Sequence, residues 1–189
     1  MKTLIINGSP HKNGHTTVLV CEFEKVLQTE TEIVRPFEHF DNIVSCKNCT
    51  GQKACKHTGE CFIKDKMNLV YADDYDNVVV ASPIYMSGLP GPMINVWSRL
   101  QIYYNLELLG RKRSLINKHG GLILTGGGYG TCNRAISQGK RLLQELNATI
   151  NPEDMIFSLN TDETPARQDE EAIDSIKKLA LRFRQYDKK

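Results

Sequence analysis

The chain has 189 residues, of which 40% are hydrophobic and 24% are charged, and its formal net charge is +2 at pH 7. These proportions are those of an ordinary soluble domain and exclude a disordered or fibrous chain. A net charge so close to zero gives no large positive potential that would attract the phosphate backbone of a nucleic acid, so we expect no nucleic-acid partner. No apolar run reaches the roughly 18 residues of a membrane span, and Leu4-Ile5-Ile6 is too short for a signal peptide. We therefore expect no membrane partner and a cytoplasmic location, in which the six cysteines are reduced.

Five short apolar runs alternate with helical patterns along the chain. The runs predict strands at 3–6, 32–35, 77–81, 121–124 and 154–157. Apolar residues at helical spacing predict helices over 19–27, 93–103, 135–146 and 173–183. Strands that alternate with helices indicate βαβ units and a parallel sheet. The length predicts a single domain over 1–189, with a cysteine-bearing insertion at about 40–65.

Three loops follow the predicted first, third and fourth strands, and all three are rich in Gly, Ser, Thr and Pro. They span 7–17, 82–92 and 125–131. In a doubly wound parallel sheet, ligands bind beyond the carboxyl ends of the strands, where the strand order reverses. Three such loops at one edge of the sheet therefore predict a binding site.

The first loop, 7–17, suits a phosphate, because backbone amides, hydroxyls and the start of a helix lie together there. It is not a P-loop, since five residues separate Gly8 from Gly14 and His15 stands where the lysine should be. It also lacks the Gly-x-Gly-x-x-Gly of dinucleotide-binding folds and the carboxylates that would hold magnesium. Two interpretations stay open: a mononucleotide phosphate held without metal, or a plain turn that caps the following helix.

Further motifs occur in a fixed order over nearly the whole chain. They are Gly8-Ser9-Pro10, Asn13-Gly14, Thr16-Thr17, Cys46-Lys47-Asn48-Cys49, Ser82-Pro83-Ile84-Tyr85 and the segment 160–166. With these motifs the chain resembles the NAD(P)H-dependent FMN reductase family, and most of all its cysteine-containing branch, which includes iron-sulfur flavoproteins. The resemblance implies a flavodoxin-like three-layer α/β/α sandwich, in which a five-stranded parallel sheet has the strand order 2-1-3-4-5.

The same resemblance assigns residues to a bound flavin. The FMN phosphate would be held by Ser9, Asn13, His15, Thr16 and Thr17. The isoalloxazine ring would be enclosed by Pro83, Ile84, Tyr85, Met86 and Ser87, and its pyrimidine side would be approached by Thr125, Gly126, Gly127 and Gly128. Glycines suit that place because they let the main chain come close to a flat ring. The alternative interpretation of Tyr85 is a partly buried side chain that covers the end of the sheet. Tyr129 is expected either over the flavin face or at the surface.

The resemblance also implies FMN as the cofactor, NAD(P)H as the electron donor, and a small acceptor such as a quinone, a nitro compound or a flavin. Because hydride transfer to a flavin needs no protein acid or base, we expect no catalytic side chain. Two other functions stay open: an iron-sulfur flavoprotein that carries electrons, and a non-redox binding module with a degenerate flavin site.

The helix after the second loop is aromatic, with Trp97, Tyr103 and Tyr104. Core packing explains one or two of these rings, and an exposed remainder would mark a subunit surface. The resemblance implies a homodimer or homotetramer. Relatives usually carry Lys and Asp in this helix, where this chain has Ile94 and Ser98, although Arg99 remains.

Four of the six cysteines fall within a short stretch, in the spacing Cys46-x2-Cys49-x5-Cys55-x5-Cys61. Four thiolates can hold a [4Fe-4S] cluster or a zinc ion. The iron-sulfur relatives usually have two residues between the second and third cysteines, where this chain has five, and zinc prefers two close pairs. A cluster, a zinc ion, and free thiols able to form a disulfide on oxidation all stay open. The other two cysteines, Cys21 and Cys132, lie on helical patterns and are interpreted as small packing residues.

Overall fold

The computed structural model describes residues 1–111, 117–128 and 130–185. The strands are β1 (Lys2–Asn7), β2 (Glu30–Val34), β3 (Asn77–Pro83), β4 (Lys118–Thr125), β5 (Ala148–Thr149) and β6 (Met155–Ser158). The helices are α1 (His15–Leu27), α2 (Cys55–Thr58), α3 (Met67–Ala72), α4 (Gly91–Arg99), α5 (Gln101–Leu108), α6 (Asn133–Glu145) and α7 (Glu170–Gln185), with a 3₁₀ turn at Pro152–Asp154. In this part of the chain, no helix is both long and apolar enough to cross a membrane.

The strands pair in parallel in the order β2-β1-β3-β4-β5, with β6 also paired to β4. This order confirms the predicted flavodoxin-like fold, with its reversal between β1 and β3. The sheet has six strands instead of the expected five, because two short strands share the outer side of β4. β5 pairs with the start of β4 and β6 pairs with its end. The predicted run at 154–157 is β6, whereas the two residues of β5 offer no apolar run to detect.

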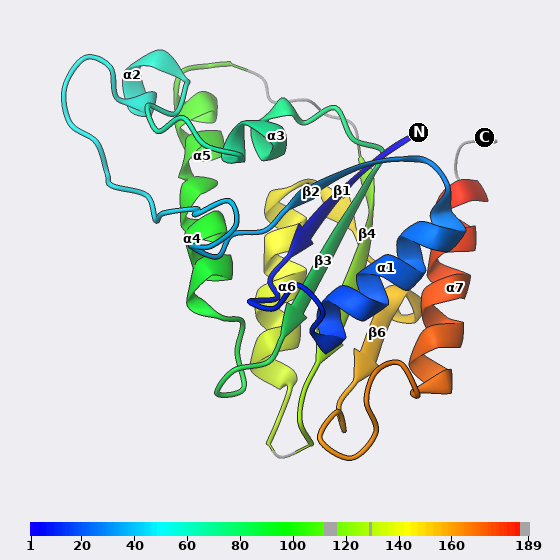
Figure 1. The fold of residues 1–189 in the computed structure, drawn as a ribbon. Helices are drawn as coiled ribbons and strands as arrows, with labels where there is room; N and C mark the ends of the chain where they lie inside the picture. Colours follow the sequence, from blue (N-terminus) through cyan, green and yellow to red (C-terminus); the bar gives the residue numbers. More distant parts are fainter. Residues whose placement is uncertain (112–116, 129, 186–189) are drawn as a thin grey trace.

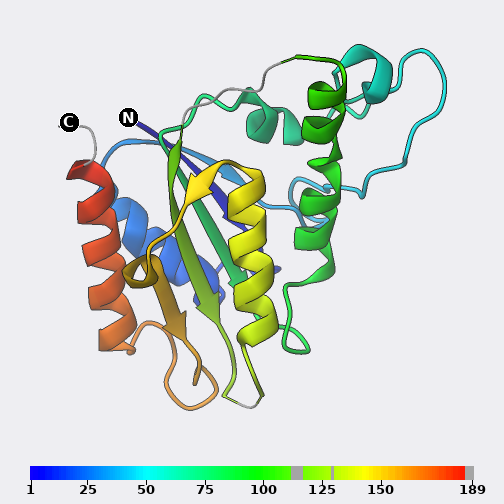
Figure 2. The same cartoon turned by 180° about the vertical axis from the view of Figure 1, so that it is seen from behind.

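Each face of the sheet is covered by helices (Figures 1 and 2). On one face α1 and α7 pack side by side, and the rings of Phe23 and Phe183 meet edge to face at 5.8 Å between centroids. The strand residues buried on this face include Ile5, Val79, Ala81, Ile123 and Ile156. Those buried on the other face, beneath α4, α5 and α6, include Leu4, Ile6, Val78, Val80, Leu122 and Leu124. Alternate residues of each central strand thus enter opposite cores, which explains the continuous apolar runs.

The predicted helix at 93–103 is divided at Leu100 into α4 and α5. The apolar face is nevertheless continuous, because Met93, Val96, Leu100 and Tyr103 are all buried in the same core. α4 begins at Gly91, two residues before the predicted start, with a proline in its first turn.

The cysteine-bearing segment leaves the sheet after β2 and packs along α4 and α5 (Figure 1). Arg99, whose side chain is 1% exposed, donates hydrogen bonds of 2.8 and 3.1 Å to the carboxylate of Asp65. It also donates to the carbonyl oxygens of Val44 and Ile63, each at 3.3 Å. Burial lowers the pKa of Arg99, but the hydrogen bonds to Asp65, together with the electrostatic interactions with Tyr71, Cys61 and Asp65, outweigh burial and raise it. A single buried guanidinium therefore joins three points of the segment to α4.

Candidate functional site

The loop between β1 and α1 is held in shape by its own side chains. The buried amide of Asn7 accepts a hydrogen bond from the backbone N–H of Ser9 at 3.0 Å and donates to the hydroxyl of Thr17 at 3.3 Å. The hydroxyls of Ser9 and Thr17 both donate to the carbonyl oxygen of His11, each at 3.0 Å. These two hydroxyls were expected to face a phosphate, but both donate their hydrogen to a backbone carbonyl of the loop itself.

The backbone amides at the start of α1 are the remaining donors. α1 begins at His15, and its N-cap Gly14 makes no side-chain capping bond. Val18 is the first residue of the helix whose N–H has a backbone acceptor, the carbonyl oxygen of Gly14. In the described part of the chain, the N–H groups of His15, Thr16 and Thr17 have no acceptor. Such amides attract an anion along the helix axis, so an anion is the natural ligand here.

Thr125, at the end of β4, connects the three loops. Its hydroxyl lies 2.6 Å from the hydroxyl of Thr16 in the first turn of α1. Its carbonyl oxygen accepts a hydrogen bond of 2.8 Å from the N–H of Ile84, in the loop after β3. The three predicted loops thus meet at one edge of the sheet, as the parallel topology requires.

A cavity of about 450 Å³ opens beside this junction. Its lining includes six of the residues predicted to surround a ring: Ile84, Met86, Ser87, Gly126, Gly127 and Gly128. The lining also includes Gly130, Thr131, Cys132 and Leu159, which were not predicted to surround the ring. Pro83, Tyr85 and Thr125 lie next to the cavity in sequence but do not line it.

Two of these outcomes have a physical explanation. Leu159 directly follows β6, so the rule that ligands lie beyond the carboxyl ends of strands would have found it. The interpretation of Cys132 as a packing residue is wrong, because its side chain is half-buried in the cavity at the start of α6. Cys21 is exposed on α1, so the same interpretation is wrong there too. The predicted position of Tyr129 lies outside the described residues.

The segment 85–88 makes a tight turn at the mouth of this cavity. The N–H of Tyr85 donates to the carbonyl of Gly88 at 2.9 Å, and the N–H of Gly88 donates back at 3.0 Å. Between them Met86 and Ser87 have φ angles of +49° and +64°, which cost a residue with a side chain about 1–2 kcal/mol each. α6 holds the turn in place, because the N–H of Ala135 donates to the carbonyl of Ser87 at 3.0 Å. The strained turn leaves Met86 94% exposed beside the cavity.

The glycines after β4 pack closely on the segment after β6. The carbonyl oxygen of Gly126 accepts hydrogen bonds from the N–H and the hydroxyl of Thr161, at 2.9 and 3.0 Å. A Cβ atom on Gly127 would lie 2.8 Å from the carboxylate carbon of Asp162. The N–H of Gly126 is bonded to the Ser158 carbonyl at 2.9 Å, whereas those of Gly127 and Gly128 have no acceptor among the described residues. These two amides are therefore the donors available to a ligand.

Tyr85 is 45% exposed, and partial burial raises the pKa of its phenol. Its hydroxyl thus stays protonated at neutral pH and can donate a hydrogen bond.

The four clustered cysteines line a second cavity, of about 400 Å³, which shares no lining residue with the first. The Nδ2 atom of Asn105 donates to the sulfur of Cys55 at 3.1 Å. The backbone N–H of Cys46 donates to the hydroxyl of Ser98 at 3.0 Å. This cavity lies between the segment and α4–α5, and α2 is at the end of the molecule opposite the loops that follow β4 and β6 (Figures 1 and 2).

The four thiols do not form a compact cage for one ion. Among the described residues, no three His, Cys, Asp or Glu side chains are grouped closely enough to hold a metal ion. A tetrahedral zinc site, which needs all of its ligands on one atom, is therefore not formed in this arrangement. The same finding gives no ready-made group of ligands for an iron-sulfur cluster among the described residues, so what the four cysteines share here is the lining of one cavity.

The sheet order and the site at its carboxyl edge place the chain among the flavodoxin-like α/β proteins. More narrowly, the chain belongs to the NADPH-dependent FMN reductase family, whose model matches residues 1–162. The resemblance given by the sequence motifs is thereby confirmed.

Two curated relatives are iron-sulfur flavoproteins. The one from Methanocaldococcus jannaschii is 29% identical over 134 residues, which are 67% of this chain and 62% of that protein. The one from Archaeoglobus fulgidus is 32% identical over 103 residues, 52% of this chain and 48% of that protein. The matches thus span less than two thirds of the length of one relative and less than half of the other.

Among solved structures, an FMN-dependent NADH-azoreductase from Bacillus anthracis in complex with FMN aligns with 97% of this chain and 100% of its own. The TM-score is 0.69 at 14% sequence identity, so this likeness supports the fold alone.

Proposed function

We propose that the protein is a flavin-dependent oxidoreductase that takes electrons from NAD(P)H and passes them to a small acceptor. One observation carries the proposal: the hydrogen bonds of Thr125 join a cavity sized for a flat ring to a helix start with unpaired amides. FMN has both parts that such a site requires, a planar head and a phosphate tail. Family membership supports the same cofactor and donor.

The residues present fit FMN. The N–H groups of His15, Thr16 and Thr17 would bind the phosphate dianion, with Ser9 and Asn13 completing the loop. The amides of Gly127 and Gly128 would donate to the pyrimidine side of the ring and stabilise negative charge there. FMN, when bound, would accept a hydride from the donor and pass the electrons to the acceptor.

The strained turn would cover one part of the ring and leave the other open. Ile84, Met86 and Ser87 line the cavity, with Tyr85 next to them in the chain as a donor. Because this turn is fixed by α6, it would hold the ring in one orientation relative to the incoming donor.

The test is an anaerobic titration of the full chain with FMN, followed by addition of NADPH. We expect FMN to bind at one site per chain and its absorbance near the visible maximum to bleach when NADPH is added. Failure of FMN to bind in repeated titrations would end the proposal and favour a non-redox binding module. Bound FMN that neither NADH nor NADPH reduces would favour an electron carrier.

A second candidate, an iron-sulfur flavoprotein that carries electrons, is favoured by the cysteine cavity. Cys46, Cys49, Cys55 and Cys61 come from three parts of the segment and yet line one space. Two relatives carry the name iron-sulfur flavoprotein. Thiolates are the donors that such clusters use, so we propose these four side chains as the ligands of a [4Fe-4S] cluster. Iron analysis of anaerobically purified protein separates this candidate from free thiols.

We also propose that two copies of the chain associate through α4 and α5. Apolar side chains are exposed there: Tyr104 is 57% exposed and Leu108 is 66% exposed. Tyr104 also lines a cavity of about 470 Å³, together with Ile94 and Trp97. Exposed aromatic and apolar side chains in one patch are typical of subunit contacts. Light scattering should give twice the mass of one chain, and the variant Tyr104→Glu should lower it to that of one chain.

A further inference from the structure

The segment 159–167, which follows β6, is bonded at two points to other loops of the site, and we call it the β6 strap. Near its start, Thr161 donates twice to the carbonyl oxygen of Gly126, from its N–H at 2.9 Å and from its hydroxyl at 3.0 Å. Near its end, the N–H of Ala166, which is completely buried, donates to Nδ1 of His15 at 3.2 Å. The strap is therefore fixed to the loop after β4 and to the start of α1.

Asp162 follows the first of these contacts and lies against Gly127. Its N–H donates to the carbonyl oxygen of Gly127 at 3.4 Å. A Cβ atom on Gly127 would lie 2.8 Å from the carboxylate carbon of Asp162 and 2.9 Å from its Oδ1, so the side chain packs on the α-carbon of this glycine. The carboxylate thus adjoins the two glycines, Gly127 and Gly128, whose N–H groups have no acceptor among the described residues.

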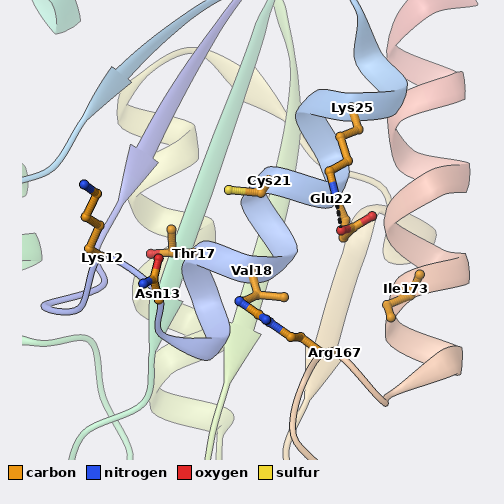
Figure 3. Close-up of a pocket in the computed structure, with 9 residues that line it drawn as sticks. All are labelled: Lys12, Asn13, Thr17, Val18, Cys21, Glu22, Lys25, Arg167 and Ile173. Atoms are coloured by element: carbon orange, nitrogen blue, oxygen red, sulfur yellow. Dashed lines mark hydrogen bonds and ion pairs between the residues drawn. The ribbon is translucent and has the colours of Figure 1, made fainter.

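The carboxylate of Asp162 has no partner that would neutralise its charge. In the part of the chain that the structure describes, it forms no ion pair and accepts no hydrogen bond. Arg167 is the only lysine or arginine of the β6 strap, and its side chain extends across Val18 on α1, where both line a cavity of about 390 Å³ (Figure 3). The other acid of the strap, Glu163, accepts a hydrogen bond of 3.0 Å from Nδ2 of Asn160. Asp162 is therefore the unpaired charge beside the glycines.

A negative charge at this place acts more strongly on a reduced flavin than on an oxidised one. The oxidised ring is neutral, whereas reduction brings negative charge to its pyrimidine side, which is the side assigned to the amides of Gly127 and Gly128. The two N–H groups stabilise that charge, and a carboxylate next to them opposes it. A fixed charge near the ring is one of the means by which a protein tunes the electronics of its cofactor.

We propose that the carboxylate of Asp162 lowers the midpoint potential of bound FMN and so makes the reduced flavin a stronger reductant. The inference rests on the proposed function, because it concerns the flavin of the same site. Asp162 does not line the ring cavity, so it acts through its charge at Gly127 and not by touching the ring. The consequence concerns the acceptor, because a stronger reductant can pass electrons to compounds that are harder to reduce.

The test is the midpoint potential of FMN bound to the full chain, measured anaerobically against reference dyes with dithionite as the reductant. Asp162→Asn keeps the size of the side chain and removes its charge. We expect this variant to bind reduced FMN roughly three- to tenfold more tightly relative to oxidised FMN, as for a partly screened charge near the ring. A tenfold change in that ratio raises the potential of a two-electron couple by about 30 mV. Fluorescence titration with oxidised FMN should show little change in affinity.

Two further variants separate the charge of Asp162 from its packing and from the net charge of the protein. Asp162→Glu keeps the charge and should keep most of the low potential of the wild type. Asp174→Asn is the matched control, because the same substitution on α7 removes a carboxylate from an exposed ion pair with Lys178, outside the lining of the ring cavity. It should leave the potential of bound FMN at the wild-type value.

Equal potentials in the wild type and in Asp162→Asn, or an equal rise in Asp174→Asn, would overturn this inference. If NADPH still reduces the bound FMN in that case, the proposed function stands. A rise confined to Asp162→Asn, in a protein whose FMN neither NADH nor NADPH reduces, would support the inference while the proposed electron donor fails. Failure of the wild type to bind FMN would overturn both.

Discussion

The hydroxyl oxygens of Thr16 and Thr125 lie 2.6 Å apart, although the two residues are 109 positions apart in the chain. Both threonines are buried. The contact joins the first turn of α1 to the end of β4, and so couples the place proposed for a phosphate to the place proposed for a ring. The predictions below test each part of that arrangement and the scaffold around it.

Ser9→Asp should weaken FMN binding by roughly tenfold or more, because a carboxylate next to the phosphate dianion adds repulsion in a partly buried loop. The matched control is Ser9→Asn, because asparagine has the size of aspartate but no charge. It should bind FMN more tightly than Ser9→Asp. Fluorescence titration of FMN measures both. Equal affinities of the two variants would mean that the phosphate lies elsewhere.

Gly127→Ala should weaken FMN binding and lower the melting temperature, because its new Cβ would lie 2.8 Å from the carboxylate carbon of Asp162. The loop after β4 or the Asp162 side chain must then move. Gly91→Ala, at a position with nothing within 4 Å, is the control and should behave as the wild type. Adding Asp162→Ala to Gly127→Ala should restore FMN binding; if the double variant stays as weak, the steric explanation is incorrect.

Arg99→Met should lower the free energy of unfolding by about 3–5 kcal/mol, because it leaves the carboxylate of Asp65 without its partner in a largely buried site. Urea denaturation measures the loss. Lys178→Met, which breaks the exposed pair with Asp174, should cost no more than about 1 kcal/mol. Similar losses in the two variants would show that Arg99 does not hold the cysteine-bearing segment.

Changing Cys49 and Cys55 together to Ser should abolish any iron bound by anaerobically purified protein. Two of the four proposed ligands would be lost from one cavity, and a cluster needs all four. Iron analysis and the visible spectrum report the change, with Cys21→Ser on the exposed side of α1 as control. Iron retained at wild-type level would exclude these thiols as ligands.

Acidification should destabilise the protein through His119. Partial burial lowers the pKa of this imidazole, although the carboxylates of Asp154 and Asp76 oppose that effect. The unfolded chain then takes up a proton more readily than the folded one, so stability is lost as the pH falls below about 6.5. His119→Gln should flatten that part of the curve of unfolding free energy against pH. A slope unchanged in His119→Gln would remove this residue as the cause.

Much of the fold could be predicted because the central strands are buried on both sides. Runs such as Val78-Val79-Val80 have no polar alternation, and every strand except β5 overlaps a predicted run. β5 was missed because a strand of two residues is defined by its pairing with Lys118 and His119, which is a tertiary contact. The division between α4 and α5 at Leu100 leaves the apolar face unbroken, so spacing alone does not reveal it.

The site was predictable to the extent that it follows from topology. Loops after β1, β3 and β4 had to meet at one edge, and the structure joins them through Thr125. The contact between α1 and the segment that follows β6 could not be predicted in this way. Ala166 is bonded to His15, and a contact between residues 151 positions apart leaves no periodic signal.

β2 ends the sheet on the side away from β6, and among the described residues no strand pairs with its outer side. An unpaired edge can act as a template on which strands of other molecules add. β2 is only five residues long and carries Glu30 and Glu32, whose negative charges repel an identical strand laid against them. The open margin of the sheet is thereby protected against aggregation through its edge.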